Sequence, residues 1–193
     1  MPVIDLVEDE TVSETDSLLP VGKWEMDPIH SSASFAVKHM GISVFRGHFD
    51  DFDATFTVDE KGTAELVGTV KVASLKVKEE RLQGHLGSPD FFDLERYPEI
   101  HFLSRSIERE GELIFITGAL TIKDQTQSVD VQGAIAGPSE TMGGAIKIGV
   151  TLDATIDRTK FGLEWNAPLP SGDMALGNNV ELAVELEFSK SEE

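Results

Sequence analysis

Cysteine is absent from this chain of 193 residues. Its absence excludes disulfide bonds, thiolate metal ligands and a cysteine nucleophile. Basic residues are scarce, because 16 Lys and Arg stand against 35 Asp and Glu and leave a net charge of −19. A charge of this sign argues against binding to nucleic acid and to anionic lipid surfaces. No apolar run approaches the roughly 20 residues of a membrane span, so we expect no stable membrane insertion.

The signatures of several enzyme and metal sites are missing as well. The sequence contains no G-x-S-x-G, G-x-G-x-x-G, Walker or H-E-x-x-H motif. No two of its five histidines stand two or four residues apart, the spacing that a metal site on one strand or helix uses. We therefore expect no metal and no cofactor. His39, on the same strand face as Phe35 and Val37, is interpreted as a hydrogen-bonded histidine of the core or its rim.

The two ends of the chain differ from its middle in composition. Residues 1–20 carry six acidic residues and no basic one, which is typical of a flexible tail. This stretch also lacks the basic start and the continuous apolar core of a secretory signal. The pattern predicts one domain at residues 21–189, between this tail and a short polar tail at residues 190–193. Without cysteine and without an export signal, we expect a cytoplasmic protein.

Between the tails, apolar and polar residues alternate with a period of two, which predicts β-strands. A shift of this alternation between Phe49 and Phe52 predicts a bulge or bend at Asp50 and Asp51. Turn signals separate the alternating stretches. About eight strands are predicted, at residues 34–39, 45–58, 66–72, 100–104, 113–122, 128–135, 145–156 and 180–188.

Many antiparallel strands in one domain form either a sandwich or a closed barrel. Glycines inside several of the predicted strands indicate sharp bends, which favour the barrel. We therefore predict an all-β fold, an antiparallel barrel of about eight strands with a short helical insertion around residues 75–98. A barrel of that size is either filled by side chains or hollow enough for one slim ligand.

The insertion contains an unusual stretch at residues 85–98, HLGSPDFFDLERYP. Phe91 and Phe92 stand between Asp90 and Asp93, with a proline near each end. Proline interrupts helices and cannot pair inside a sheet. The stretch predicts a compact plug of one or two helical turns whose rings point into the core.

The aromatic residues are mostly phenylalanine, with 11 Phe against 2 Trp and 1 Tyr. Phenylalanine has no polar atom and suits a dry interior. Phe161 and Trp165 differ from the rest, because a loop rich in proline and glycine follows them. A large ring in such a loop is a candidate lid over the mouth of a barrel.

Four blocks of the sequence, in order and suitably spaced over about residues 22–189, resemble the YceI-like family. They are Trp24 with residues 27–41 (DPIHSSASFAVKHMG) and 46–49 (RGHF), then residues 85–98, residues 118–122 (GALTI) and residues 157–162 (DRTKFG). The resemblance implies a lipocalin-like barrel with an elongated apolar tunnel that binds polyisoprenoids or similar long-chain amphiphiles. Many relatives carry Arg-Asp before the histidine of the second block, where this chain has Leu82 and Gln83. Many relatives are also exported.

The resemblance also implies a set of ligand-binding residues. His30, Arg81 and His85 are expected as polar contacts at the mouth. The residues expected to line the tunnel or its mouth are Phe35, His39, Phe49, Phe91, Phe92, Phe102, Phe161 and Trp165.

The leading hypothesis is a protein that binds, transports or stores a long-chain lipid, not an enzyme. We expect a bound isoprenoid, isoprenoid quinone or fatty-acyl chain, with a neutral head group in preference to a diphosphate. One alternative is an enzyme that uses His30, His39 or His85 on a bound lipid. The other is a protein-interaction module whose barrel is filled by side chains. A homodimer is also considered.

Overall fold

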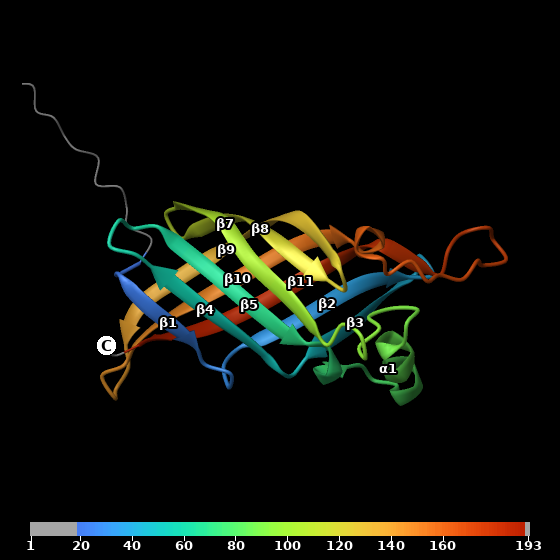
Figure 1. Ribbon diagram of the computed structural model, residues 1–193, viewed down its shortest axis with the longest axis horizontal. Coiled ribbons are helices and arrows are strands. Elements are labelled where there is room, and N and C mark those ends of the chain that lie inside the picture. Colours follow the sequence, from blue (N-terminus) through green and yellow to red (C-terminus); the bar gives the residue numbers. More distant parts are fainter. Residues whose placement is uncertain (1–18, 192–193) are drawn as a thin grey trace, which may run out of the picture.

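The computed structural model describes residues 19–191, which form an antiparallel β-barrel with an α-helix at one end (Figure 1). Predictions about residues 1–18 and 192–193 lie outside this range. The strands are β1 (Gly22–Met26), β2 (Ser32–His39), β3 (Ser43–Phe49), β4 (Phe52–Val58), β5 (Ala64–Lys71), β6 (Leu75–Lys76), β7 (Glu99–Glu110), β8 (Leu113–Ile122), β9 (Gln125–Glu140), β10 (Ile146–Asp157) and β11 (Leu176–Lys190). The helices are α1 (Glu80–Gly87) and the 3₁₀ turns η1 (Val72–Ser74) and η2 (Arg158–Phe161).

Eight of these strands close the barrel. In the order β1, β4, β5, β7, β8, β9, β10 and β11, each pairs antiparallel with the next, and β11 pairs back with β1. The closure places Trp24 opposite Lys190 and Met26 opposite Phe188. The predicted antiparallel barrel of about eight strands is therefore confirmed. In residues 19–191 no helix is long and apolar enough to cross a membrane.

The wall of the barrel is built differently at the end where α1 lies. There β11 pairs with β2 instead of β1, and β3 and β6 continue the sheet from β2. The predicted bend at Asp50 and Asp51 is confirmed, because it separates β3 from β4. Helix α1 and the loop at residues 162–175 lie at this same end (Figure 1). We call this end the mouth.

The helical insertion is shorter than predicted and lies earlier in the chain. Helix α1 ends at Gly87, so Phe91 and Phe92 follow it in a series of turns and are not part of it. Ser88 ends the helix, since its backbone N–H and its hydroxyl both donate to the carbonyl oxygen of His85, at 3.1 and 2.7 Å. The next residue is Pro89, which has no N–H to continue the helix.

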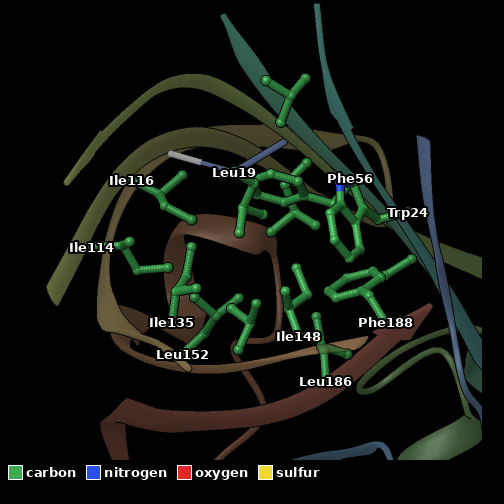
Figure 2. Packing of buried hydrophobic residues seen from close by; sticks show 14 residues of the cluster. Leu19, Trp24, Phe56, Ile114, Ile116, Ile135, Ile148, Leu152, Leu186 and Phe188 are labelled. Carbon is green, nitrogen blue, oxygen red and sulfur yellow. The ribbon is translucent and has the colours of Figure 1, made fainter. Parts of the chain in front are cut away.

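The half of the barrel away from the mouth is filled by side chains. Trp24, Phe56 and Phe188 are fully buried there and lie among isoleucine, leucine and valine side chains that point toward one another (Figure 2). Leu19, which the sequence analysis assigned to the acidic tail, is 3% exposed and belongs to this cluster. Apolar burial of this kind is the main source of stability for the fold. We call this part the filled half.

Strands β9 and β10 separate on the way to the mouth. Their pairing is recorded up to Gln132 and Asp153, and β10 then continues with β11 alone until η2 begins. Asp157 caps η2, because its Oδ1 accepts hydrogen bonds from the backbone N–H of Thr159 at 3.0 Å and from its hydroxyl at 2.7 Å. These bonds lower the pKa of Asp157 below its ordinary value. The turn places the side chain of Arg158 inside the barrel wall, where it is buried.

Candidate functional site: an apolar cavity

A cavity of about 640 Å³ occupies the barrel between the filled half and the mouth. Its inner part is lined by Ala54, Leu66 and Leu186, which also belong to the filled half. At the other end Val44 and Trp165 line it and are exposed to solvent, so the cavity opens at the mouth. The barrel is therefore filled in one half and hollow in the other.

Glycines make room for two of the rings that line this cavity. A Cβ atom at Gly47 would lie 2.5 Å from the ring of Phe35, and one at Gly118 would lie 2.4 Å from the ring of Phe102. Both distances are far shorter than a carbon–carbon contact. The two rings can therefore occupy these positions only because the neighbouring strands carry glycine there.

Most of the predicted ligand-binding residues meet around the cavity. Those that line it are Phe35, His39, Phe49, His85, Phe91, Phe92, Phe102 and Trp165. They come from β2, β3, α1, the turns after α1, β7 and the loop at residues 162–175. For the residues on strands, the period of two agrees with a shared direction, because alternate residues of a strand point to one face.

A chain of aromatic contacts forms part of the cavity wall. The ring of Phe35 lies 6.3 Å from that of Phe45 and 5.9 Å from that of Phe49, measured between ring centroids. Phe49 meets Phe92 edge to face at 6.0 Å. Such pairs are favourable at centroid separations of about 4.5–7 Å. Through these contacts the rings connect β2 and β3 to the turns after α1, which contain no strand to pair with them.

A second group of rings covers the mouth. His85 meets Trp165 edge to face at 4.8 Å and Phe91 at 5.1 Å, and Phe91 lies 5.4 Å from Trp165. The Nε2 atom of His85 is 2.9 Å from Oδ2 of Asp90, which orients the imidazole. The loop that carries Trp165 and the insertion that carries Phe91 thus meet over the cavity. This is the position that a lid requires.

His30 lies away from the mouth, although the sequence analysis expected it there. It belongs to the turn between β1 and β2, where its Nδ1 is 3.1 Å from Oδ2 of Asp27 and 3.6 Å from Oε1 of Glu187. Lys147 contacts the same two carboxylates, at 2.8 and 2.5 Å from its Nζ. Hydrogen bonds from Lys147, and next from His30, hold the pKa of Asp27 far below its ordinary value.

The cluster of Asp27, His30 and Glu187 contains atoms of the kind that bind metal ions, all within 4.8 Å of one another. The ammonium group of Lys147 already contacts both carboxylates, where a cation would otherwise sit. The backbone N–H of Asp27 also donates to the carbonyl of Glu187 at 2.7 Å. The cluster therefore ties the turn between β1 and β2 to β10 and β11.

Two further predicted residues do not line the cavity. Arg81 is exposed in the first turn of α1, where its backbone N–H donates to Oε1 of Glu79 at 3.0 Å. Phe161, the last residue of η2, is only 1% exposed and is buried in the core. The expected contacts of His30 and Arg81 with a ligand at the mouth are thus not supported by their positions.

Arg158 was not among the predicted ligand-binding residues, yet it lines the cavity and is 5% exposed. Burial lowers the pKa of its guanidinium, and the nearby charge of Asp157 opposes that effect. An arginine remains charged at neutral pH all the same. Arg158 belongs to the block at residues 157–162 that resembles the family. Alternation of apolar and polar residues applies only within a strand, however, so it does not indicate the direction of a side chain that follows the end of a strand.

Much of the remaining lining is aliphatic and follows the same alternation as the phenylalanines. Val129 and Val131 of β9, Leu120 of β8, and Leu182 and Val184 of β11 belong to it. These residues could have been found from the sequence, because each stands at an inward position of a predicted strand.

Comparisons with known proteins agree with this architecture. The model of the YceI-like domain matches residues 24–188. A UPF0312 protein of Staphylococcus aureus (strain USA300) is 32% identical over 172 residues, which are 86% of this chain and 96% of that protein. BcnA of Burkholderia cenocepacia has the same fold, with a TM-score of 0.72 and 23% identity over 84% of this chain and 98% of BcnA. A polyisoprenoid-binding domain from Saccharophagus degradans has a TM-score of 0.64 and 14% identity, over 87% of this chain and 98% of that domain.

Proposed function

The chain belongs to the YceI-like family, and from this membership and its cavity we propose that it binds a long-chain apolar molecule and carries or stores it. The ligand class is a polyisoprenoid, an isoprenoid quinone or a fatty-acyl amphiphile. The S. degradans domain, described as polyisoprenoid-binding, supports this class because it shares the fold. The observation that carries the proposal is the apolar cavity of this chain.

The size and lining of the cavity suit such a ligand. Its volume of about 640 Å³ lies within the roughly 300–1,000 Å³ of typical ligand sites. Burial of apolar chain contributes about 0.8 kcal/mol per CH₂, so a five-carbon isoprene unit contributes roughly 4 kcal/mol. Association costs about 4–15 kcal/mol. A few such units therefore suffice for tight binding without strong contacts to a head group.

A binding function is favoured over catalysis on a bound lipid. The partner of the His85 ring is Asp90, a carboxylate that orients the imidazole but is not paired with a nucleophile. In residues 19–191, no serine or threonine hydroxyl is hydrogen-bonded to the ring of His39 or His85, as a nucleophile activated by a base requires. The hollow half also disfavours the alternative of an interaction module with a filled barrel.

The test is organic extraction of the denatured pure protein followed by mass spectrometry, together with uptake of a polyprenol, a quinone or a fatty amide by the delipidated protein. We expect a long-chain lipid in the extract and uptake in vitro. An empty extract combined with failure to take up all three ligands would refute the proposal.

Two neighbouring positions of β11 provide a matched pair of variants. Leu182 lines the cavity, whereas Ala183 is exposed on the outer face. Leu182→Trp adds an indole to the cavity and should lower uptake at least tenfold, while Ala183→Trp should leave it unchanged. Equal uptake by the two variants would mean that the ligand binds outside the cavity.

A further inference from the structure

Arg158 is a buried, positively charged side chain in a cavity whose lining is mainly apolar. A guanidinium has five N–H groups. Three of them donate to backbone carbonyls: Nε–H to Gly177 at 2.9 Å, and the two on Nη1 to Leu163 at 2.5 Å and Trp165 at 2.9 Å. Nη2 is buried and has no hydrogen-bond partner. The two N–H groups of Nη2 are therefore left over in the wall of the ligand cavity.

Among the described residues, the positive charge of Arg158 is not held in a salt bridge, although the charge of Asp157 lies near enough to act on it. No carboxylate in residues 19–191 forms a salt bridge with Arg158. Asp157, next to it in the chain, uses its Oδ1 to accept two hydrogen bonds from Thr159. A buried charge outside a salt bridge, and a buried donor without an acceptor, both destabilise a protein. A bound ligand that supplies the missing acceptor would remove this cost.

We infer that Arg158 anchors the head group of the ligand, with Nη2 donating to a carboxylate or carbonyl oxygen while the apolar tail runs down the cavity toward the filled half. This inference rests on the proposed binding function. Nη2 is almost fully covered in the ligand-free protein, so such binding requires a small local rearrangement for the oxygen to reach it. Arg158 also donates hydrogen bonds to the backbone carbonyls of Leu163 and Trp165, so the residue that would anchor the head group is directly bonded to the loop that covers the mouth.

The same geometry selects against a diphosphate head. Arg158 is the only lysine or arginine among the described residues that line the cavity, and it offers a single free nitrogen. Diphosphates carry several charges and are held by clusters of arginine, lysine or metal ions. The acidic Asp53 and Asp153 also line the cavity. One oxygen, neutral or singly charged, matches what Nη2 provides.

The test compares ligands that share one tail and differ only at the head. Dodecanoic acid, dodecanamide, dodecane and dodecylamine compete with a fluorescent alkylpyrene for the delipidated full-length protein. We expect the acid and the amide to bind about tenfold more tightly than dodecane, or more, in line with a hydrogen bond to a charged group. The cationic amine should bind more weakly than the acid. If the acid binds more tightly than the amide, the natural head group carries a negative charge that compensates Arg158. If the amide binds more tightly, the natural head group is a neutral carbonyl.

Variants then assign the preference to Arg158. Arg158→Met and Arg158→Lys should reduce the preference for acid over dodecane at least tenfold and fivefold, respectively, with dodecane affinity within about threefold of the wild type. Arg46→Met, at an exposed position of β3, is the control and should change nothing. A parallel loss for acid and dodecane would make Arg158 a purely structural residue and overturn the inference.

The comparison of ligands with the wild type remains decisive if the variants do not fold. Equal affinity for dodecane, the acid and the amide would overturn the role of Arg158 while leaving the proposed binding function intact. Failure of the delipidated protein to take up a polyprenol, a quinone and a fatty amide, together with an empty extract, would instead refute the proposed function itself.

Discussion

Phe188 and Phe49 are the same residue type in the two halves of one barrel, and their truncation should have unequal effects. Phe188 is fully buried in the filled half, with its ring 6.2 Å from that of Phe56. Phe188→Ala leaves a closed void and should cost about 3–5 kcal/mol. For a domain of this size, about 2–4 °C of melting temperature corresponds to 1 kcal/mol, so the loss should be about 6–20 °C.

Phe49 lines the cavity and is only partly buried, so its truncation enlarges an existing space. Phe49→Ala loses part of a transfer free energy of about 1.5–3 kcal/mol and two ring contacts. We expect a cost of about 1–2.5 kcal/mol, which corresponds to about 2–10 °C.

The assay is thermal unfolding of the delipidated proteins, followed by circular dichroism and checked by urea denaturation. Added ligand at 100 times its Kd should stabilise the wild type and Phe188→Ala by about 2.7 kcal/mol. At the same concentration, Phe49→Ala should gain less, because the ligand loses a contact there. If Phe49→Ala destabilised the ligand-free protein as much as Phe188→Ala, the mouth half would be filled and our account of the cavity would be wrong.

Three other predictions follow from local geometry. Gly133→Ala should destabilise the barrel severely, since its Cβ would lie 1.8 Å from the carbonyl oxygen of Thr151, whereas Gly149→Ala, with its nearest contact at 4.0 Å, should be tolerated in a melting experiment. The lowered pKa of Asp27 means that its ion pair stabilises the fold above its unfolded pKa of about 3.9 and that this contribution is lost as the pH falls further. Lys147→Met should therefore flatten the acid side of a plot of melting temperature against pH, and an unchanged slope would contradict this. Trp165→Ala removes two ring contacts at the mouth, each worth about 0.5–1.5 kcal/mol, and should speed ligand release about tenfold in stopped-flow fluorescence, whereas an unchanged rate would mean that the ligand leaves elsewhere.

The strand content and the direction of most lining residues could be predicted from the sequence, because both depend on local alternation. Phe35, Phe49 and Phe102 were assigned to the tunnel from the family resemblance, and their positions in the alternating strands agree with an inward direction. The bend at Asp50 and Asp51 was visible for the same reason. The end of α1 was misplaced, since the plug was taken to be helical through Phe91 and Phe92, whereas Ser88 ends the helix before them.

His30 and Arg158 show what local patterns do not contain. His30 was expected at the mouth, but its partner Glu187 lies 157 positions away on β11, and only the pairing of distant strands brings them together. Arg158 was not listed among the ligand-binding residues, because its direction depends on the separation of β9 from β10 after Gln132 and Asp153. No local pattern in the sequence indicates either the partner of His30 or the direction of Arg158.

The sequence by itself determined an all-β barrel, the face of each strand that points inward, and a phenylalanine-rich interior, because alternation and residue type act over a few neighbouring positions. Tertiary structure alone decided which half of that interior is filled and which is hollow. Trp24, Phe56 and Phe188 fill one half because β1, β4 and β11 meet there. In the other half, β11 pairs with β2 instead of β1, β3 extends the sheet from β2, and the insertion that contains α1 covers the end. A filled and a hollow barrel have the same alternation of apolar and polar residues in sequence. They differ in the distance between opposite walls, which the tertiary structure sets.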